Sequence, residues 1–265
     1  NASYEDQMLL KQKFGLDKPL WEQYVQFMLN AAQGEFADSF VHGRPAADLI
    51  VERVPATLQL ALPAFFISIL IGVSTGILSA VRRDSVLDRF GRLFSLFGMA
   101  LPEFVVAMFL ILTFGVMLNW LPVAGKGGWQ HSIMPVISMS LPSTAALFRI
   151  SRSSMIEALN AEYIVMARLK GVPERFVILV HALKNGCVPV VTILGIMIPM
   201  LVTGSVVLET VYAWPGVGSL IMTSFFARDY PVIQLFVIMI STIIVCSNLL
   251  LDILYAYIDP RIRYQ

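Results

Sequence analysis

The chain has 265 residues, of which 57% are hydrophobic and 14% are charged. An ordinary soluble domain carries roughly 25% charged residues, and a large apolar core still needs a charged shell to stay in solution. The composition therefore excludes a free-standing soluble protein. The formal net charge of +1 creates no overall field that would attract nucleic acid. Cys187 and Cys246 stand in apolar stretches and indicate neither a disulfide framework nor a CxxC site.

Five apolar stretches approach or exceed the roughly 20 residues that a helix needs to cross a bilayer core. These predicted spans are 55–80, 93–118, 132–147, 189–208 and 232–257. The third is short, and it contains Pro135 and Pro142, which bend or interrupt a helix. Gly72 and Gly76 form a GxxxG pair, which favours close helix packing. The expected fold class is an all-α polytopic membrane bundle.

The basic residues assign the loops to the two sides of the membrane. They gather between the first two spans, between the third and fourth spans, and after the last span, whereas the alternate short loops contain only Lys126 and Arg228. Because short basic loops stay cytoplasmic, the loop 151–185 and the tail 259–265 are predicted to be cytoplasmic. Residues 1–54 are then predicted to lie outside, before a transmembrane domain over 55–258.

The outer segment 1–54 contains no signal-type apolar run with a basic front. An exported segment of this length does not cross a membrane unaided, so we expect a further transmembrane helix upstream, which would make six in the intact protein. Within the segment, Tyr24, Phe27, Met28 and Ala31 share helical spacing. This spacing predicts a short amphipathic helix at the outer surface.

The loop 151–185 is too polar to span the membrane, yet it is patterned. The sequence predicts a helix over 161–170, with Asn160 as its N-cap, and Gly171 and Pro173 ending it. Glu162 lies near the positive end of this helix and Arg168 near its negative end. The pattern fits either a solvated connector or a docking helix for a cytoplasmic partner.

Short motifs along the whole chain allow a comparison with a known family. They read LDKPL at 16–20, PATL at 55–58, WLP at 120–122, EAL at 157–159, EY at 162–163, AR at 167–168, KG at 170–171, HALKN at 181–185, ETVYAWPGVG at 209–218, RDYPV at 228–232 and DPRIR at 259–263. The motifs between 157 and 185 resemble the EAA loop of bacterial ABC importer permeases. The full set resembles the dipeptide, oligopeptide and nickel permeases within that group.

The resemblance implies a type I ABC importer permease in the bacterial inner membrane, in contact with lipid. Its partners would be a second, homologous permease subunit, two ATPase subunits and an extracytoplasmic substrate-binding protein. The chain contains no GxxxxGK[ST] loop, so we expect neither an enzyme nor a bound cofactor here, with ATP and Mg²⁺ held by the ATPases. The resemblance assigns ATPase coupling to Glu157, Ala158, Glu162, Tyr163, Ala167, Arg168, Lys170 and Gly171.

The loop after the fourth span contains a Pro-Gly pair, Pro215-Gly216, that suits a type II turn, and Gly218 adds backbone freedom. A surface turn explains this pattern. The resemblance instead implies an outer gate or a docking surface for the binding protein. The candidate residues are Tyr212, Trp214, Pro215, Gly216 and Gly218.

Two acidic residues fall inside predicted spans, where a carboxylate is costly. Glu103 departs from the small or amide residue usual in the family, which makes it the candidate for contacting a cationic substrate group such as a peptide amino terminus. A buried, hydrogen-bonded carboxyl is the alternative. Asp252 resembles an acid shared by the family and is interpreted as structural.

Peptides, including glutathione-like ones, are the substrates that the resemblance favours, and nickel or a metallophore is the alternative. His42, His131 and His181 are scattered over both predicted sides and form no evident metal site. A secondary transporter is the competing class. It would favour ion-binding acids in several spans and an inverted repeat, whereas the sequence has two such acids and no evident repeat.

Overall fold

The computed structural model describes residues 18–203 and 206–258, so the predicted tail 259–265 and the first part of the outer segment lie outside the described residues. The helices in chain order are α2 (Leu20–Ala32), α3 (Ala46–Ser68), η1 (Ile69–Val73), α4 (Ser74–Val81), α5 (Val86–Ala100), α6 (Glu103–Leu110), η2 (Ile111–Met117), α7 (Gln130–Leu159), α8 (Glu162–Leu169), α9 (Glu174–Phe176), η3 (Val177–Ala182), α10 (Leu183–Gly186), α11 (Val188–Thr203), α12 (Val206–Val211), α13 (Val217–Phe226) and α14 (Tyr230–Ile258). The η elements are short π-helical stretches. Within the described residues the regular structure is helical apart from one isolated bridge between Asp38 and Pro45.

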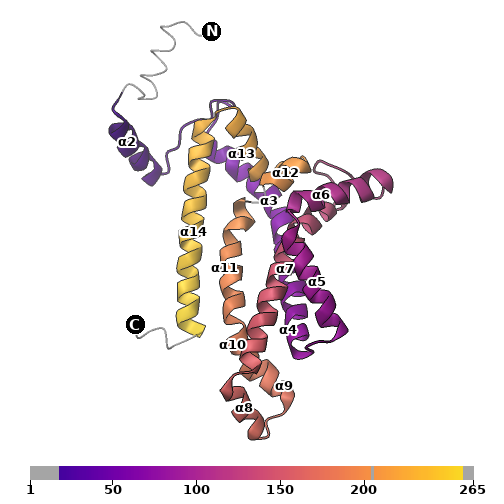
Figure 1. Ribbon diagram of the computed structural model, residues 1–265. Helices are drawn as coiled ribbons and strands as arrows, with labels where there is room; N and C mark the ends of the chain where they lie inside the picture. Colours follow the sequence, from indigo (N-terminus) through magenta and orange to yellow (C-terminus); the bar gives the residue numbers. More distant parts are fainter. Residues whose placement is uncertain (1–17, 204–205, 259–265) are drawn as a thin grey trace, which may run out of the picture.

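Three helices are long and apolar enough to cross a membrane: Ala46–Val81, Gln130–Leu159 and Tyr230–Ile253. Two bent helix pairs also qualify, which gives up to five spans if each pair counts as one. In Figure 1 the long helices lie side by side, with α8 and α9 at one end of the bundle and α12 and α13 at the other. The predicted all-α membrane bundle is confirmed.

The first span is a continuous helix of 36 residues, Ala46–Val81, made of α3, η1 and α4. The helix therefore begins before residue 55, where the predicted span starts. The charged residues within 46–54 made this part of the chain unlike a membrane span in the sequence. It nevertheless belongs to the helix, and its Leu49 and Ile50 are buried against α13 and α14. At about 1.5 Å per residue, the helix is roughly 54 Å long and extends beyond a bilayer core of about 30 Å.

The second predicted span, 93–118, is not one straight helix. The pair Val86–Ala100 and Glu103–Met117 bends by 100° at a short break. Pro102 causes the break, because a proline disfavours helical backbone at the preceding residue. Leu101 accordingly has an extended ψ of 122°. The bend places Glu103 in the first turn of a new helix, α6.

The third span is longer than predicted: α7 runs unbroken over 30 residues, Gln130–Leu159. Pro135 and Pro142 both lie inside it, so the expected interruption did not occur. Prolines are tolerated in membrane helices that pack against neighbouring helices. Near Pro142, α7 is joined to α3 by Ser68, which donates to the Ser140 carbonyl at 3.1 Å.

The remaining predicted elements lie close to the observed ones. The fourth apolar stretch, 189–208, is divided between α11 and α12, and residues 204–205 between them are outside the described residues. The fifth corresponds to α14, Tyr230–Ile258. The predicted outer amphipathic helix is α2, Leu20–Ala32, which lies apart from the bundle in Figure 1 and has no buried residue.

Close backbone contact joins the first span to α7, as the GxxxG pair predicted. A Cβ atom at Gly72 would lie 2.7 Å from the Thr144 carbonyl oxygen, and one at Gly76 would lie 2.6 Å from the Phe148 carbonyl oxygen. Real Cβ atoms do not approach so closely. These two positions therefore require glycine for packing, and α7 becomes the central helix of the bundle.

Gly76→Leu is expected to lower the midpoint of thermal unfolding in detergent, because overpacking a helix contact costs about 1–3 kcal/mol or more. The matched control is Leu70→Phe, which enlarges a side chain that is 70% exposed on the same helix. Equal midpoints for the two variants would contradict the assigned contact.

Candidate functional site

The helix α8, Glu162–Leu169, lies at the end of the molecule that carries the basic loops, opposite α12 and α13 (Figure 1). The sequence predicted this helix over 161–170, and the position is confirmed. The predicted cap was wrong. Asn160 has helical backbone angles and ends α7, so the N-cap is Ala161, which makes no side-chain cap hydrogen bond.

The C-terminal end of α8 is a Schellman motif, in which the chain turns back at a left-handed residue. Gly171 has φ +77°. Its N–H donates to the Arg168 carbonyl at 3.0 Å, and the Val172 N–H donates to the Ala167 carbonyl at 3.2 Å. The role predicted for Gly171 in ending the helix is confirmed, and the geometry requires a residue that tolerates positive φ.

A bidentate ion pair joins α8 to α9. Arg168 donates to Glu174 through Nη2 at 2.7 Å and through Nε at 3.1 Å. The hydrogen bonds to the Glu174 carboxylate raise the pKa of the Arg168 guanidinium above its usual value. Arg168 is thus engaged inside the loop, where it holds the two short helices together.

One face of α8 is buried and the other exposes apolar side chains. Ile164 is fully buried, and Ala167 packs against the same hydrophobic cluster. Leu169 is 77% exposed and Met166 is 58% exposed. Exposed apolar patches of this kind mark interaction surfaces when they lie outside the membrane.

The other coupling candidates lie around this surface. Glu157 and Ala158 form the last turn of α7, with Ala158 buried and Glu157 exposed. Glu162, Tyr163 and Lys170 are exposed. The fold therefore brings the predicted coupling residues together around α8, although Ala167 packs in the hydrophobic cluster inside the loop.

A buried charged pair joins α7 to the first turn of α5. Asp88 is fully buried, and it accepts hydrogen bonds from Arg152 Nε at 2.5 Å and Nη2 at 2.9 Å. Ser79 and the Asp84 N–H also donate to it. Buried carboxylates persist where partners satisfy them in this way. The pair makes this end of α4, α5 and α7 one unit, directly above the loop that carries α8.

At the opposite end, Glu209 of α12 is the centre of a buried polar network. Its side chain is 2% exposed, and its carboxylate accepts from Thr57 Oγ1 at 2.7 Å and from the Ser219 N–H at 3.0 Å. Thr57 Oγ1 in turn accepts from the Val217 N–H at 2.8 Å. The network connects α3, α12 and α13.

Two buried aromatic residues continue this attachment. Trp214 is fully buried, and its indole N–H donates to the Ala56 carbonyl at 2.7 Å. The Tyr212 hydroxyl lies 3.0 Å from Ser138 Oγ and donates to the Ala107 carbonyl at 3.4 Å. These side chains face the interior, so they attach the segment between α12 and α13 to α3, α6 and α7 rather than form a surface.

The type II turn predicted at Pro215-Gly216 is not present. Gly216 has φ −99°, whereas a type II turn would require a positive φ there, and the left-handed residue is Ala213 at φ 48°. Gly218 lies inside α13, and a Cβ there would approach Val206 Cα to 2.7 Å. Both glycines are therefore needed for close packing around Glu209, not for backbone freedom.

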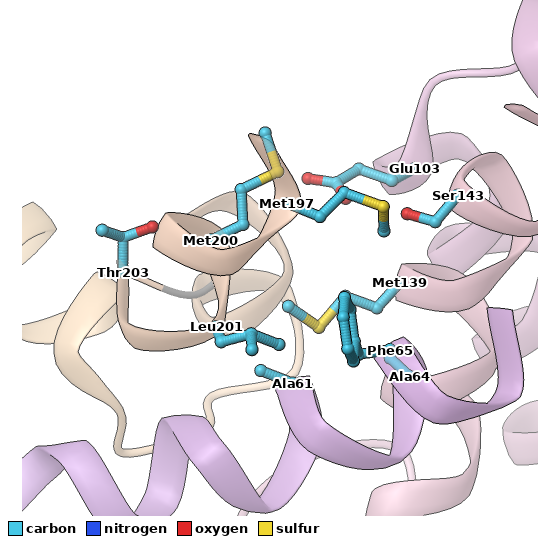
Figure 2. A pocket seen from close by; sticks show the side chains of 10 residues that line it. All are labelled: Ala61, Ala64, Phe65, Glu103, Met139, Ser143, Met197, Met200, Leu201 and Thr203. Atoms are coloured by element: carbon cyan, nitrogen blue, oxygen red, sulfur yellow. The ribbon is translucent and has the colours of Figure 1, made fainter. Parts of the chain in front are cut away.

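A cavity of about 240 Å³ opens between α3, α6, α7 and α11 (Figure 2). Its walls are formed by Ala61, Ala64, Phe65, Glu103, Met139, Ser143, Met197, Met200, Leu201 and Thr203. In Figure 2 the carboxylate of Glu103 and the hydroxyl of Ser143 both point toward the methionines of α11. Of the two acids predicted within spans, Glu103 thus lines a cavity, whereas Asp252 lies exposed on α14.

Sequence reasoning missed the buried acids Asp88, Glu209 and Asp229. Asp229 is fully buried and accepts from Ser39 Oγ at 2.5 Å and from the Phe40 N–H at 2.9 Å. Each acid falls outside the predicted spans, so the sequence pattern indicated a loop residue rather than a buried one. The available signal was position, since Glu209 directly follows the apolar run 189–208.

Comparison with known proteins assigns the family. A model of the family described as the binding-protein-dependent transport system inner membrane component matches residues 72–264. The chain belongs to this family. The predicted transport role and inner-membrane location of the permease are thereby confirmed.

The permease also matches individual proteins. The glutathione transport system permease protein GsiC of Escherichia coli (strain K12) and that of Shigella flexneri serotype 5b (strain 8401) are each 40% identical to it over 257 residues, which cover 97% of this chain and 84% of theirs. These relatives support the resemblance to peptide and nickel permeases of ABC importers.

A solved structure supports the fold. A chain from inward-facing conformations of the MetNI methionine ABC transporter superposes with a TM-score of 0.64 at 16% identity, covering 80% of the permease and 96% of that chain. At this identity the match establishes the ABC importer permease fold alone.

Thr57→Val is expected to destabilise the permease by about 1–3 kcal/mol, because it leaves the Val217 N–H and one Glu209 oxygen without a buried partner. Thermal unfolding in detergent measures the effect. Thr223→Val is the matched control, since that exposed hydroxyl bonds only within α13. A Thr57 variant as stable as the control would refute the network.

Proposed function

We propose that the permease forms half of the pathway of an ATP-driven importer of peptides, together with a second, homologous permease subunit. Two ATPase subunits would hold and hydrolyse ATP with Mg²⁺, and an extracytoplasmic binding protein would deliver the substrate. The peptide assignment is supported by the relatives, whose names give glutathione, a tripeptide, as the transported compound.

The observation that carries the proposal is the continuity of α7. Met139 and Ser143, which line the cavity, lie in this helix. The helix ends at Leu159, two residues before Ala161, the N-cap of α8. A force applied to α8 therefore reaches the cavity through one unbroken helix. The Asp88–Arg152 pair transmits the same displacement to α4 and α5.

We assign ATPase docking to the exposed face of α8, formed by Val165, Met166 and Leu169. Its apolar side chains lie outside the candidate spans, so burial in a cleft of the ATPase would remove them from water. Glu157, Glu162, Tyr163 and Lys170 surround this face and supply polar contacts. Gly171 and Arg168 act indirectly, because they fix the shape of the loop.

ATP-driven approach of the two ATPases would then draw the two α8 helices together and change which side of the pathway is open. At the outer end, Glu209 and Trp214 hold the region of α12 and α13 against α3, and Tyr212 holds it against α6 and α7. We propose that this braced unit moves as an outer gate. Gly216 and Gly218 permit its close packing, and Pro215 lies at its half-buried edge.

Leu169→Asp and Met166→Asp are expected to lower ATP-dependent peptide uptake by at least about tenfold, since each charge would be buried without a partner at the docked face. The measurement is uptake and ATPase activity of the reconstituted complex. The control is Val86→Asp, which adds a carboxylate at another exposed apolar position, in the first turn of α5, where a helix favours it.

The docking assignment fails if the α8 variants assemble, insert and import peptide at the wild-type rate. Loss of uptake in the Val86 control as well would mean that the effect is a general one of added charge.

A further inference from the structure

The cavity between α3, α6, α7 and α11 has a definite chemical character. Among the described residues that line it, Glu103 is the one that carries a charge, and Ser143 and Thr203 add hydroxyl groups. The rest of the wall is apolar, with Phe65 and the thioethers of Met139, Met197 and Met200. A mainly apolar concavity with a few convergent polar groups is typical of a ligand site.

The position of the cavity fits a site on the transport pathway. Ala61, Ala64 and Phe65 lie near the middle of the 36-residue helix Ala46–Val81, so the cavity sits at mid-depth. It also adjoins the 100° bend between α5 and α6, which places the half-buried Glu103 in the first turn of α6. Discontinuous helices at mid-depth are where transporters commonly place their substrate contacts.

From this arrangement we infer that the cavity is a subsite for the first residue of a transported peptide, with Glu103 binding the α-ammonium group and the methionine wall accepting an apolar side chain. This inference rests on the proposed import of peptides and specifies which peptides pass. The volume of about 240 Å³ lies below the roughly 300–1,000 Å³ of drug-sized ligand sites, so one residue fits better than a whole peptide.

The methionine wall determines tolerance rather than strict selection. Met side chains are unbranched and polarizable, and they adapt to apolar groups of different shape. Met200 is 61% exposed, so the wall on α11 is open on one side. The subsite therefore accepts many apolar side chains and discriminates by charge.

The charge pattern of the cavity also predicts a preference between peptides and glutathione. In glutathione the amino group stands beside a free carboxylate, because the first residue is linked through its side chain. Glu103 would repel that second carboxylate, and no basic group stands among the described lining residues to offset it. The cavity therefore favours ordinary α-linked peptides with a free amino terminus over glutathione.

The test uses proteoliposomes that contain the complete importer, with its own binding protein in excess, and radiolabelled Leu-Ala and glutathione as probes. We expect Glu103→Gln to lower Leu-Ala uptake by roughly ten- to a hundredfold, the loss typical of a charged hydrogen bond. Glu103→Asp should restore much of the rate, because it keeps the charge. Glu35→Gln, which removes an exposed carboxylate that does not line the cavity, should leave uptake unchanged.

A charge reversal gives a second measurement. Glu103→Arg should raise the ratio of glutathione to Leu-Ala uptake above the wild-type ratio, and because the binding protein is the same in every sample, its own selectivity cancels. The inference is overturned if Glu103→Gln imports Leu-Ala at the wild-type rate, if the Gln and Asp variants lose uptake together, or if reversal leaves the ratio unchanged. A wild-type complex that imports no peptide would instead refute the proposed function.

Discussion

The bundle depends on the close approach of the first span to α7. Gly72 and Gly76 bring two helix backbones together where any side chain would collide with the Thr144 and Phe148 carbonyls. In lipid there is little hydrophobic drive between helices, so such close van der Waals contact is what holds them. Because α5, α6 and α11 also pack on α7, the position of this helix fixes both the cavity and the loop that carries α8.

Buried acids mark both ends of this framework. Asp88 binds Arg152 at the end that carries α8, whereas Glu209 accepts hydrogen bonds from hydroxyl and backbone donors of α3 and α13 at the opposite end. Each carboxylate would be costly without its partners, so each one specifies a single arrangement of the elements it joins. In the proposed import cycle these two units would move as rigid bodies, with movement confined between them.

Between these ends, the bend at Pro102 has a chemical consequence. By ending α5 and starting α6, it brings Glu103 to the wall of an otherwise apolar cavity. A carboxylate in such surroundings interacts strongly with a cation, because the medium is less polar than water. The same local break that lowers the regularity of the helix thus supplies the one charged group in the described lining of the cavity.

The sequence by itself determined the membrane class, the approximate spans, the helix α8 with its Gly171 stop, and the GxxxG contact. Each of these depends on composition or on local spacing, which the chain carries without reference to its fold. Only the tertiary structure decided that α7 continues through Pro135 and Pro142, that the second span bends, and that Gly216 and Gly218 serve packing. It also decided that Asp88, Glu209 and Asp229 are buried. Their donors come from residues as far away as 190 positions along the chain, and no local pattern encodes a partner at that distance.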